Sequence, residues 1–196
     1  MTGYEVRIAD KSEQEAVLST LLLAFGVDPC MRYALTKAET FLANFRHLAL
    51  ALGGGAFEHG SAYVGADGAA AALWLPPGVE SDGEAIGALV GELVDEPEKQ
   101  AVLAQVGEAM GENHPHEPHW YLAMIGVDPS RQGRGLGSAV LKEGLTRCDA
   151  DGLPAYLESS NPANIPLYER HGFEVVGLIQ PGDFPPLVPM VRRPRG

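Results

Sequence analysis

WYLAMIGVDPSRQGRGLGS, residues 120–138, is the stretch from which the fold can be inferred. Its first eight residues, 120–127, are apolar and rich in β-forming side chains, which predicts a buried strand. Pro129 ends this strand, because proline cannot donate to a sheet ladder. Glycines at 133, 135 and 137 then allow a tight turn before an apolar helical pattern begins. The first N–H groups of a helix are unpaired and carry partial positive charge. The sequence therefore predicts a site for phosphate oxygens at this turn.

Three glycine-rich motifs compete for the turn. A P-loop requires a lysine directly before Ser138, and Gly137 stands there instead, which excludes that motif. The dinucleotide motif G-x-G-x-x-G fits better, because Gly133 and Gly135 match and Glu158 lies about where a ribose-binding acid is expected. However, five residues separate the strand from Gly133, and roughly two-thirds of the chain precedes the motif. No room is then left for the βαβαβ unit that should follow.

The third motif, [QR]-x-x-G-x-[GA], is filled by residues 132–137. It resembles the pyrophosphate-binding motif of the GNAT acetyltransferase superfamily. Residues 161–173, NPANIPLYERHGF, resemble the second motif of that superfamily, N-x-x-[AN]-x-x-[LF]-Y-E-x-x-G-F, at the expected distance. Within the superfamily, the runs that begin at residues 117, 132, 154 and 168 look most similar to puromycin N-acetyltransferase and its relatives. The first half of the chain is similar to them only loosely, so the resemblance implies the reaction and leaves the acceptor open.

This resemblance implies an α/β fold of the α+β type. Its mixed, mostly antiparallel central sheet is flanked by helices, with acetyl-CoA bound at the splay beside the fourth strand. We expect residues 1–196 to form a single N-acetyltransferase domain, because a chain of this length can bury one core and carries no repeats or long linkers. The patterns predict strands at 6–8, 62–66, 69–75, 120–127, 155–159, 173–179 and 187–192. They predict helices before 25, at 36–52, twice between 79 and 118 with a break at 95–97, at 136–151 and at 165–170.

Local signals refine these boundaries. Asp10 or Ser12 can cap the first helix, and Ser12 has capping-box spacing to Glu15. Thr36 and Glu39 have the same spacing before the second helix. Asp67-Gly68 predicts a type I′ turn in a hairpin.

The resemblance also implies which residues bind acetyl-CoA. Backbone N–H groups from Gln132 to Ser138 suit the pyrophosphate, and Arg134 can add charge. The pantetheine arm would lie along the 124–127 strand and pair with the backbone there, where an N–H group would also polarise the thioester carbonyl. Asn161 and Asn164 would bond amides of the arm, or would form turns and cap helices. The full set of expected cofactor-binding residues is Ile125, Val127, Gln132, Gly133, Arg134, Gly135, Gly137, Ser138, Asn161 and Asn164.

Acetyl transfer to an amine requires an acid and a base. Tyr168 matches the usual general acid of the family, which protonates the departing thiolate. Its reference pKa of roughly 10 keeps it protonated at neutral pH. Glu158 lies on a strand that should border the acceptor, and could take the proton of the ammonium directly or through water. A structural hydrogen bond or salt bridge for Glu158, and simple packing for Tyr168, are the alternatives.

Composition limits the partners. The net charge of −12 and pI near 4.8 argue against a nucleic-acid binder and mildly favour a cationic small molecule. The sequence predicts no secretory signal and no membrane helix, and hence a cytoplasmic protein.

Cys30 and Cys148 are too few for a disulfide framework. The run HPHEPH at 114–119 is interrupted by prolines and lacks a second ligand cluster, so we expect no metal site. Trp74, Trp120 and Tyr156 could line an acceptor pocket or pack in the core.

These observations together predict an acetyl-CoA-dependent N-acetyltransferase acting on the primary amine of a small molecule. Two alternatives stay open: acetylation of a protein or peptide amine, and a non-catalytic acetyl-CoA-binding module. A homodimer is compatible with the sequence and is not specified by it.

Overall fold

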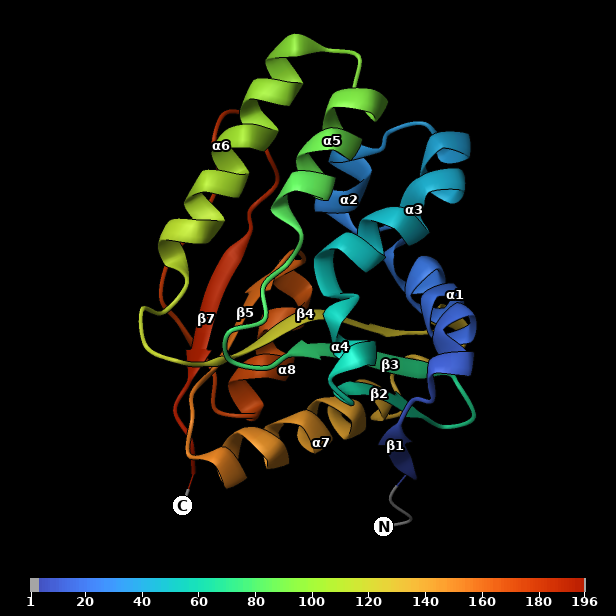
Figure 1. Ribbon diagram of the computed structural model, residues 1–196, viewed down its shortest axis with the longest axis vertical. Helices are drawn as coiled ribbons and strands as arrows, with labels where there is room; N and C mark the ends of the chain where they lie inside the picture. The colour runs from blue at the N-terminus through green and yellow to red at the C-terminus, as the bar shows by residue number, and fades with distance from the viewer. Residues whose placement is uncertain (1–3, 196) are drawn as a thin grey trace.

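The structure of the protein, a computed structural model, describes residues 4–195. Within this range one seven-stranded sheet has the order β1-β2-β3-β4-β5-β7-β6 (Figure 1). The strands are β1 Val6–Ile8, β2 Ala62–Gly65, β3 Ala70–Leu75, β4 Trp120–Val127, β5 Ala155–Ser159, β6 Glu174–Val175 and β7 Val188–Arg192. Only the β4–β5 pair is parallel among the pairings of these described strands. The predicted mixed, mostly antiparallel sheet is confirmed.

Helices cover both faces of this sheet. The helices are α1 Gln14–Phe25, α2 Pro29–Ala34, α3 Ala38–Gly53, α4 Gly55–Glu58, α5 Gly83–Leu93, α6 Pro97–Asn113, α7 Leu136–Asp151 and α8 Ile165–Arg170. Short 3-10 turns are η1 Lys11–Glu13, η2 Pro129–Arg131 and η3 Pro162–Asn164. One core joins α1, α3 and α4 to one face of the sheet, and a second joins α7 and α8 to the other. We call these the α1 face and the α7 face.

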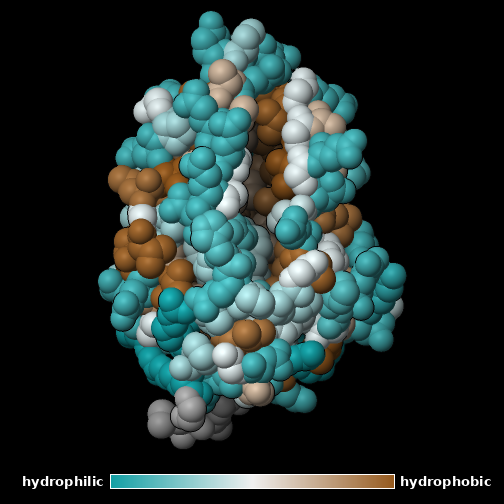
Figure 2. Space-filling model, turned by 60° about the vertical axis from the view of Figure 1, so that its left-hand side comes forward, coloured by the Kyte–Doolittle hydropathy of each residue, from teal (hydrophilic) through white to brown (hydrophobic). Residues whose placement is uncertain are grey.

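The two predicted acidic helices, α5 and α6, are present with their break near residue 96, and they project beyond the sheet (Figure 1). A small apolar cluster joins α6 to the loop between β6 and β7; its buried members are Val106, Ile179, Phe184 and Leu187. The side of the molecule that carries α6 is hollowed in its upper half, where hydrophobic side chains line a groove (Figure 2). The chain leaves α6 at His114 and reaches β4 through a six-residue segment.

Strand β4 contains a one-residue bulge that decides which side chains face the cofactor side. Leu73 pairs with Met124, whereas the next residue, Trp74, pairs with Leu122, so Ala123 is the extra residue. Side chains before the bulge alternate normally, but Ala123 and Met124 both pack on the α1 face. Ile125 is thereby moved to the α7 face, where Val127 also packs.

Of the two caps predicted before the first helix, Asp10 is confirmed, whereas the predicted capping boxes are wrong. Asp10 caps η1, which leads into α1: its side chain accepts from Ser12 N while Glu13 Oε2 accepts from Asp10 N at 2.8 Å. The capping box therefore joins Asp10 to Glu13, not Ser12 to Glu15. Helix α3 begins after Lys37 without a side-chain cap, because the chain before it is still tied to α2 through Arg32 and the Thr36 carbonyl at 2.6 Å.

The hairpin turn has the predicted type I′ form. Its central residues, Asp67 and Gly68, both have positive φ, and Ala69 N donates to Ala66 O at 3.1 Å. The paired strands end at Gly65 and Ala70, one residue short of the prediction on each side, and Thr20 on α1 donates to the Gly68 carbonyl at 2.6 Å. The sixth strand is shorter than its prediction. Strand β6 stops at Val175 because Pro189 on β7, which has no N–H group, stands opposite the next residue.

Candidate active site

Strands β4 and β5 diverge soon after they meet, and this divergence creates the site. Their parallel pairing includes only Trp120 with Ala155 and Tyr121 with Tyr156. Beyond the bulge, none of the described strands lies beside the edge of β4 that faces β5. Such an edge presents N–H and C=O groups to any extended ligand.

Ile125 and Val127 present their backbone groups to this open edge. Asp128 N donates to Ala69 O at 2.9 Å, so this pair is a hydrogen-bonded pair of the β3–β4 ladder. Bonded and non-bonded pairs alternate along an antiparallel ladder. Val127, paired with Ala70, and Ile125, paired with Ala72, therefore direct their N–H and C=O groups away from β3. The orientation agrees with the predicted pairing to an amide-bearing arm.

The glycine-rich turn has the geometry of an anion site. Gly133 and Gly135 have φ of 73° and 85°, and a Cβ at either would have no heavy atom within 4 Å. Glycine is thus required for backbone conformation, and the space beside it is open. Gly135 is the N-cap of α7, and no side chain caps this 16-residue helix. The first N–H groups of α7, at residues 136–138, are therefore available to phosphate oxygens.

Ser138 is held by a residue that the sequence did not suggest. Its Oγ lies 2.6 Å from His171 Nε2, and this contact anchors the first turn of α7 to the end of α8. Burial, followed by the nearby guanidinium of Arg170, lowers the pKa of His171. His171 is therefore neutral at pH 7 and can act as either partner in this hydrogen bond.

A cavity of about 400 Å³ runs from the glycine turn along the open edge of β4 to Tyr168. It brings together most of the expected cofactor-binding residues, and several residues not expected from the sequence, among them Leu167 and Arg170, also line it. The lining is Ala24, Ile125, Gly126, Val127, Gln132, Gly133, Gly135, Leu136, Gly137, Ser138, Asn164, Leu167, Tyr168 and Arg170.

Two expected cofactor residues do not line this cavity. Arg134 is exposed at the rim of the glycine turn. Asn161 caps η3, since its Oδ1 accepts from Ala163 N at 3.0 Å, which is the turn-forming role left open above. Arg170 is placed to supply the positive charge that the sequence assigned to Arg134.

Tyr168 lies on α8 at the end of the cavity and is 5% exposed. Its ring packs edge-on against Phe173 at 6.0 Å. Burial raises the pKa of Tyr168, and the negative charge of Asp28 raises it further. The hydroxyl is therefore protonated at neutral pH and able to donate a proton.

Asp28 is a buried carboxylate that the sequence did not single out. It is 7% exposed and caps α2, accepting from Met31 N at 3.0 Å. Ser160 Oγ, just beyond β5, donates to the other carboxylate oxygen at 2.5 Å. Asp28 therefore ties the start of α2 to the end of β5, beside the cavity end that holds Tyr168.

Glu158 lies on the opposite, α1 face of the sheet, two residues beyond the last β4–β5 pair. Its side chain is 2% exposed, and Oε1 has no hydrogen-bond partner within residues 4–195. His114 Nε2 approaches this oxygen at 3.4 Å. Tyr156 and Tyr121 flank the carboxylate; burial, and then the charge of Glu158, raises the pKa of both hydroxyls. The gap between β4 and β5 separates Glu158 from Tyr168.

His114 was assessed from the sequence only as a metal ligand. The described residues contain no group of three or more His, Cys, Asp or Glu side chains that could hold a metal ion. The imidazole ring of His114 contacts the rings of Tyr156 and Tyr121 at centroid distances of 4.5 and 4.7 Å. The signal available in the sequence was the i, i+2 spacing of Tyr156 and Glu158, which puts both on one face of β5.

Trp74 and Trp120 do not line an acceptor pocket. Both are buried on the α7 face, where Trp74 packs against Gly144 and Trp120 Nε1 donates to Asp151 at 2.9 Å. Their bulk fills the space under α7, on the cofactor side. Tyr156 alone of the three packs on the α1 face.

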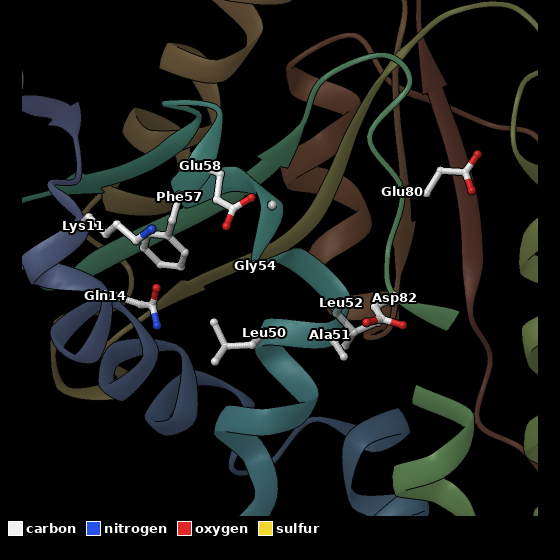
Figure 3. Close-up of a pocket in the computed structure, with 11 residues that line it drawn as sticks. Lys11, Gln14, Leu50, Ala51, Leu52, Gly54, Phe57, Glu58, Glu80 and Asp82 are labelled. Atoms are coloured by element: carbon white, nitrogen blue, oxygen red, sulfur yellow. The ribbon is translucent and has the colours of Figure 1, made fainter. Parts of the chain in front are cut away.

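A second cavity, of about 320 Å³, lies away from these groups between α1, α3, α4 and the loop before α5 (Figure 3). Lys11 and Gln14 approach it from one side, Glu58 from α4, and Glu80 and Asp82 from the loop. It contains none of the expected site residues and no glycine turn, so we assign the chemistry to the β4–β5 site. In the described chain, no helix combines the length and hydropathy needed to cross a membrane.

Comparison with known proteins gives an independent result. Residues 42–173 match the profile described as "Acetyltransferase (GNAT) family". The uncharacterized N-acetyltransferase C550.08 of Schizosaccharomyces pombe is 38% identical over 78 residues, which cover 38% of this chain and 32% of that protein. The mycothiol acetyltransferase of Streptosporangium roseum is 44% identical over 63 residues, 31% of this chain and 19% of the relative. The chain thus aligns with no more than about a third of either protein.

Solved structures agree over nearly the whole chain. A Corynebacterium glutamicum protein described as histone acetyltransferase HPA2 and related acetyltransferase superposes with a TM-score of 0.71 and 24% identity, covering 100% of this chain and 98% of that one. An agmatine N-acetyltransferase mutant gives a TM-score of 0.71 at 17% identity, with coverage of 97% and 99%. At these identities the likeness establishes the fold alone.

Proposed function

The chain belongs to the acetyltransferase (GNAT) family, and we propose that it is an acetyl-CoA-dependent N-acetyltransferase whose acceptor is the primary amine of a small molecule. One observation carries the proposal: a single cavity joins an uncapped helix N-terminus, an open strand edge and a buried tyrosine. These three features suit the pyrophosphate, the amide-bearing arm and the thioester of acetyl-CoA, in that order.

The residues of the chain fit this cosubstrate. The free N–H groups at the start of α7 would bind pyrophosphate oxygens, with charge from Arg170 in the cavity and Arg134 at its rim. Ile125 and Val127 would pair with the amides of the arm through the backbone groups that they direct away from β3, although the Val127 carbonyl also accepts from Gln132 Nε2 at 3.3 Å. Asn164, which lines the cavity, and Asn161, whose Oδ1 accepts from Ala163 N, are our candidates for further amide contacts.

The proposed chemistry moves two protons. The ammonium must lose a proton before its nitrogen can attack the thioester carbonyl, and Glu158 accepts that proton. As the C–N bond forms and the C–S bond breaks, a backbone N–H of the open β4 edge stabilises the charge on the carbonyl oxygen. Tyr168 then donates its hydroxyl proton to the departing thiolate, and the second proton that the nitrogen loses as the amide forms restores the Tyr168 hydroxyl. The products are an N-acetylated amine and a free thiol.

The electrostatics favour a cationic acceptor. Buried carboxylates stand on both sides of the gap, Glu158 on the α1 face and Asp28 at the end of β5. The net charge of −12 would raise the local concentration of small cations. Both features support an amine that arrives as an ammonium ion.

A thiol-release assay with acetyl-CoA tests the proposal. We would screen small primary amines beside peptides with a free N-terminus or lysine, and measure CoA binding by calorimetry. Thiol release with small amines supports the proposal. Release with peptides alone would overturn the acceptor class, and tight CoA binding without release from any amine would overturn catalysis.

A further inference from the structure

Two histidines connect Glu158 to the protein surface. His114 follows α6 and His119 precedes β4, and His114 Nδ1 lies 3.1 Å from His119 Nε2. His119 Nδ1 lies 2.9 Å from the Glu117 carbonyl oxygen. With the 3.4 Å approach of His114 Nε2 to Glu158 Oε1, these contacts form a continuous chain.

The acceptors in this chain fix the tautomers. A carbonyl oxygen can only accept, so His119 carries its proton on Nδ1 and directs a bare Nε2 at His114. Burial lowers the pKa of His119 below its ordinary 6.5, which keeps the ring neutral at pH 7. His114 must therefore donate from Nδ1. If His114 Nε2 carried no proton, the lone pair of this nitrogen would face a lone pair of the Glu158 carboxylate, and the two would repel.

That last contact is stable only when a proton lies between the two groups. The pair therefore holds one shared proton that can move along the chain. Solvent exposure rises from Glu158 toward the histidines, because the side chain of Glu158 is 2% exposed and that of His114 is 29% exposed.

We propose that His114 and His119 relay to solvent the proton that Glu158 takes from the acceptor ammonium. The inference rests on the proposed function, because it needs an amine substrate. In each turnover Glu158 gains the ammonium proton on one oxygen, and the proton shared with His114 comes to rest on His114 Nε2. His114 passes its Nδ1 proton to His119 Nε2, and His119 releases its Nδ1 proton to water. One proton enters and one leaves, so charge balances, and both imidazole rings then turn over to restore their starting tautomers.

The surroundings of the pair suit a relay. The ionisable groups that face it are Tyr121 on β4, Tyr156 and Glu158 on β5, and Glu117 in the same segment. Both tyrosines have a raised pKa and stay neutral. Glu117 forms an ion pair with Arg193, which holds the carbonyl acceptor of His119 in place.

Substitutions at these positions test the relay. His114→Gln keeps an amide that can donate to Glu158 but cannot pass a proton on, whereas His114→Ala opens space for added imidazole. His116→Gln, an exposed histidine in the same segment, is the matched control. We expect kcat/KM for the amine to fall about 10- to 100-fold in both His114 variants, less than the 10²–10⁴ typical of a group that touches the substrate. Acetyl-CoA affinity and the His116→Gln enzyme should be unchanged.

Three readouts separate a relay from a structural role. The acid limb of the pH profile of kcat/KM, set in the wild type by protonation of His119 below pH 6.5, should move in His114→Gln. Added imidazole should restore His114→Ala. Nitrogen-15 NMR of the acetyl-CoA-bound wild type should show His119 protonated on Nδ1, whatever the activity.

The opposite results are equally clear. An unmoved pH profile without imidazole rescue, wild-type rates in His114→Gln, or an Nε2–H tautomer of His119 would each overturn the relay while the proposed function stands. If His114→Ala does not fold, His119→Gln gives the same pH comparison. Wild-type enzyme that releases no thiol with any amine would instead remove the proposed function, and the relay with it.

Discussion

Gly144 on α7 allows the helix to lie against Trp74, and its replacement by alanine gives the sharpest test of the packing. A Cβ at this position would lie 2.1 Å from Trp74 Nε1 and 2.4 Å from Cε2, about 1.3 Å below the 3.4 Å at which ordinary contacts begin. Trp74 is 0% exposed near the end of β3, is enclosed by the core of the α7 face and cannot move aside. Helix α7 must therefore shift outward.

The magnitude follows from two opposing effects. Overpacking of a close-packed core costs typically about 1–3 kcal/mol. Alanine gains roughly 0.5–1 kcal/mol over glycine inside a helix. The rigid indole favours the upper end of the cost, so Gly144→Ala should lose about 2 kcal/mol in the free energy of unfolding. For a chain of this size, that lowers Tm by roughly 4–8 °C.

Gly107 on α6 is the matched control, because it is exposed in a helix interior and a Cβ there meets nothing within 4 Å. Gly107→Ala should raise Tm by roughly 1–4 °C through helix propensity alone. Thermal and urea unfolding of the two variants beside the wild type is the assay. Equal stabilisation by both substitutions would refute the argument, since it would mean that α7 does not lie on Trp74 as described.

Three further predictions follow from the site and from the packing around it. Gly135→Asp should abolish acetyl-CoA binding, measured by calorimetry, because a negative charge would enter the anion site. Gly152→Asp is the control: this glycine, at the other end of α7, is equally open and also has positive φ, so the variant should have the same backbone strain and still bind acetyl-CoA. Tyr168→Phe should lower kcat and kcat/KM together by roughly 10²–10⁴ with little change in CoA affinity, and wild-type turnover in a folded variant would rule out the acid role. Asp149 pairs with the buried Arg192 at 2.7 Å, and this contact lowers the pKa of Asp149, so the pair stabilises the fold above the unfolded-state pKa near 3.8 and this stabilisation is lost as pH falls through the lower folded pKa. Asp149→Asn should lower the free energy of unfolding by ~3 kcal/mol at pH 7, at the lower end for breaking a buried pair. In urea titrations between pH 5 and pH 2 the stability of this variant should depend less on pH, and a slope equal to that of the wild type would contradict the assignment.

The sequence predicted the central elements well because their signals are local. The β4 strand, β5, α7 and α8 have the predicted residues, since each combines a hydrophobic period with a proline or glycine at its end. Glycines with positive φ could be predicted at 133 and 135, because the turn chemistry is written in adjacent residues. The family could be identified from two motifs for the same reason.

What the sequence did not reveal depends on contacts between distant residues. Thr20 donates to the Gly68 carbonyl of the hairpin turn from 48 positions away, and no local pattern records that contact. Arg170 and His171 join the glycine turn only because α8 packs beside α7. His114 meets Glu158 through the exit from α6, and no spacing in the sequence records that approach. The roles of all these residues in catalysis stay predictions until kinetics test them.

The extra residue in β4 determines which side chains of the second half of the strand face each side of the sheet. Before Ala123 the side chains alternate between the two faces in the ordinary way, and after it the alternation is displaced by one residue. If the strand were straightened with no residue removed, Met124 and Gly126 would turn to the α7 face in place of Ile125 and Val127. Gly126, whose missing side chain lets Ala24 of α1 approach to 2.6 Å of the Cβ position, would then be replaced under α1 by a residue too large for the space, and α1 would be separated from the sheet. Deletion of Ala123 together with the bulge would instead leave Ile125 and Val127 on the α7 face, because Leu122 and Met124 would then alternate normally. A strand grafted from a relative without the bulge therefore keeps the cofactor edge only if it is one residue shorter.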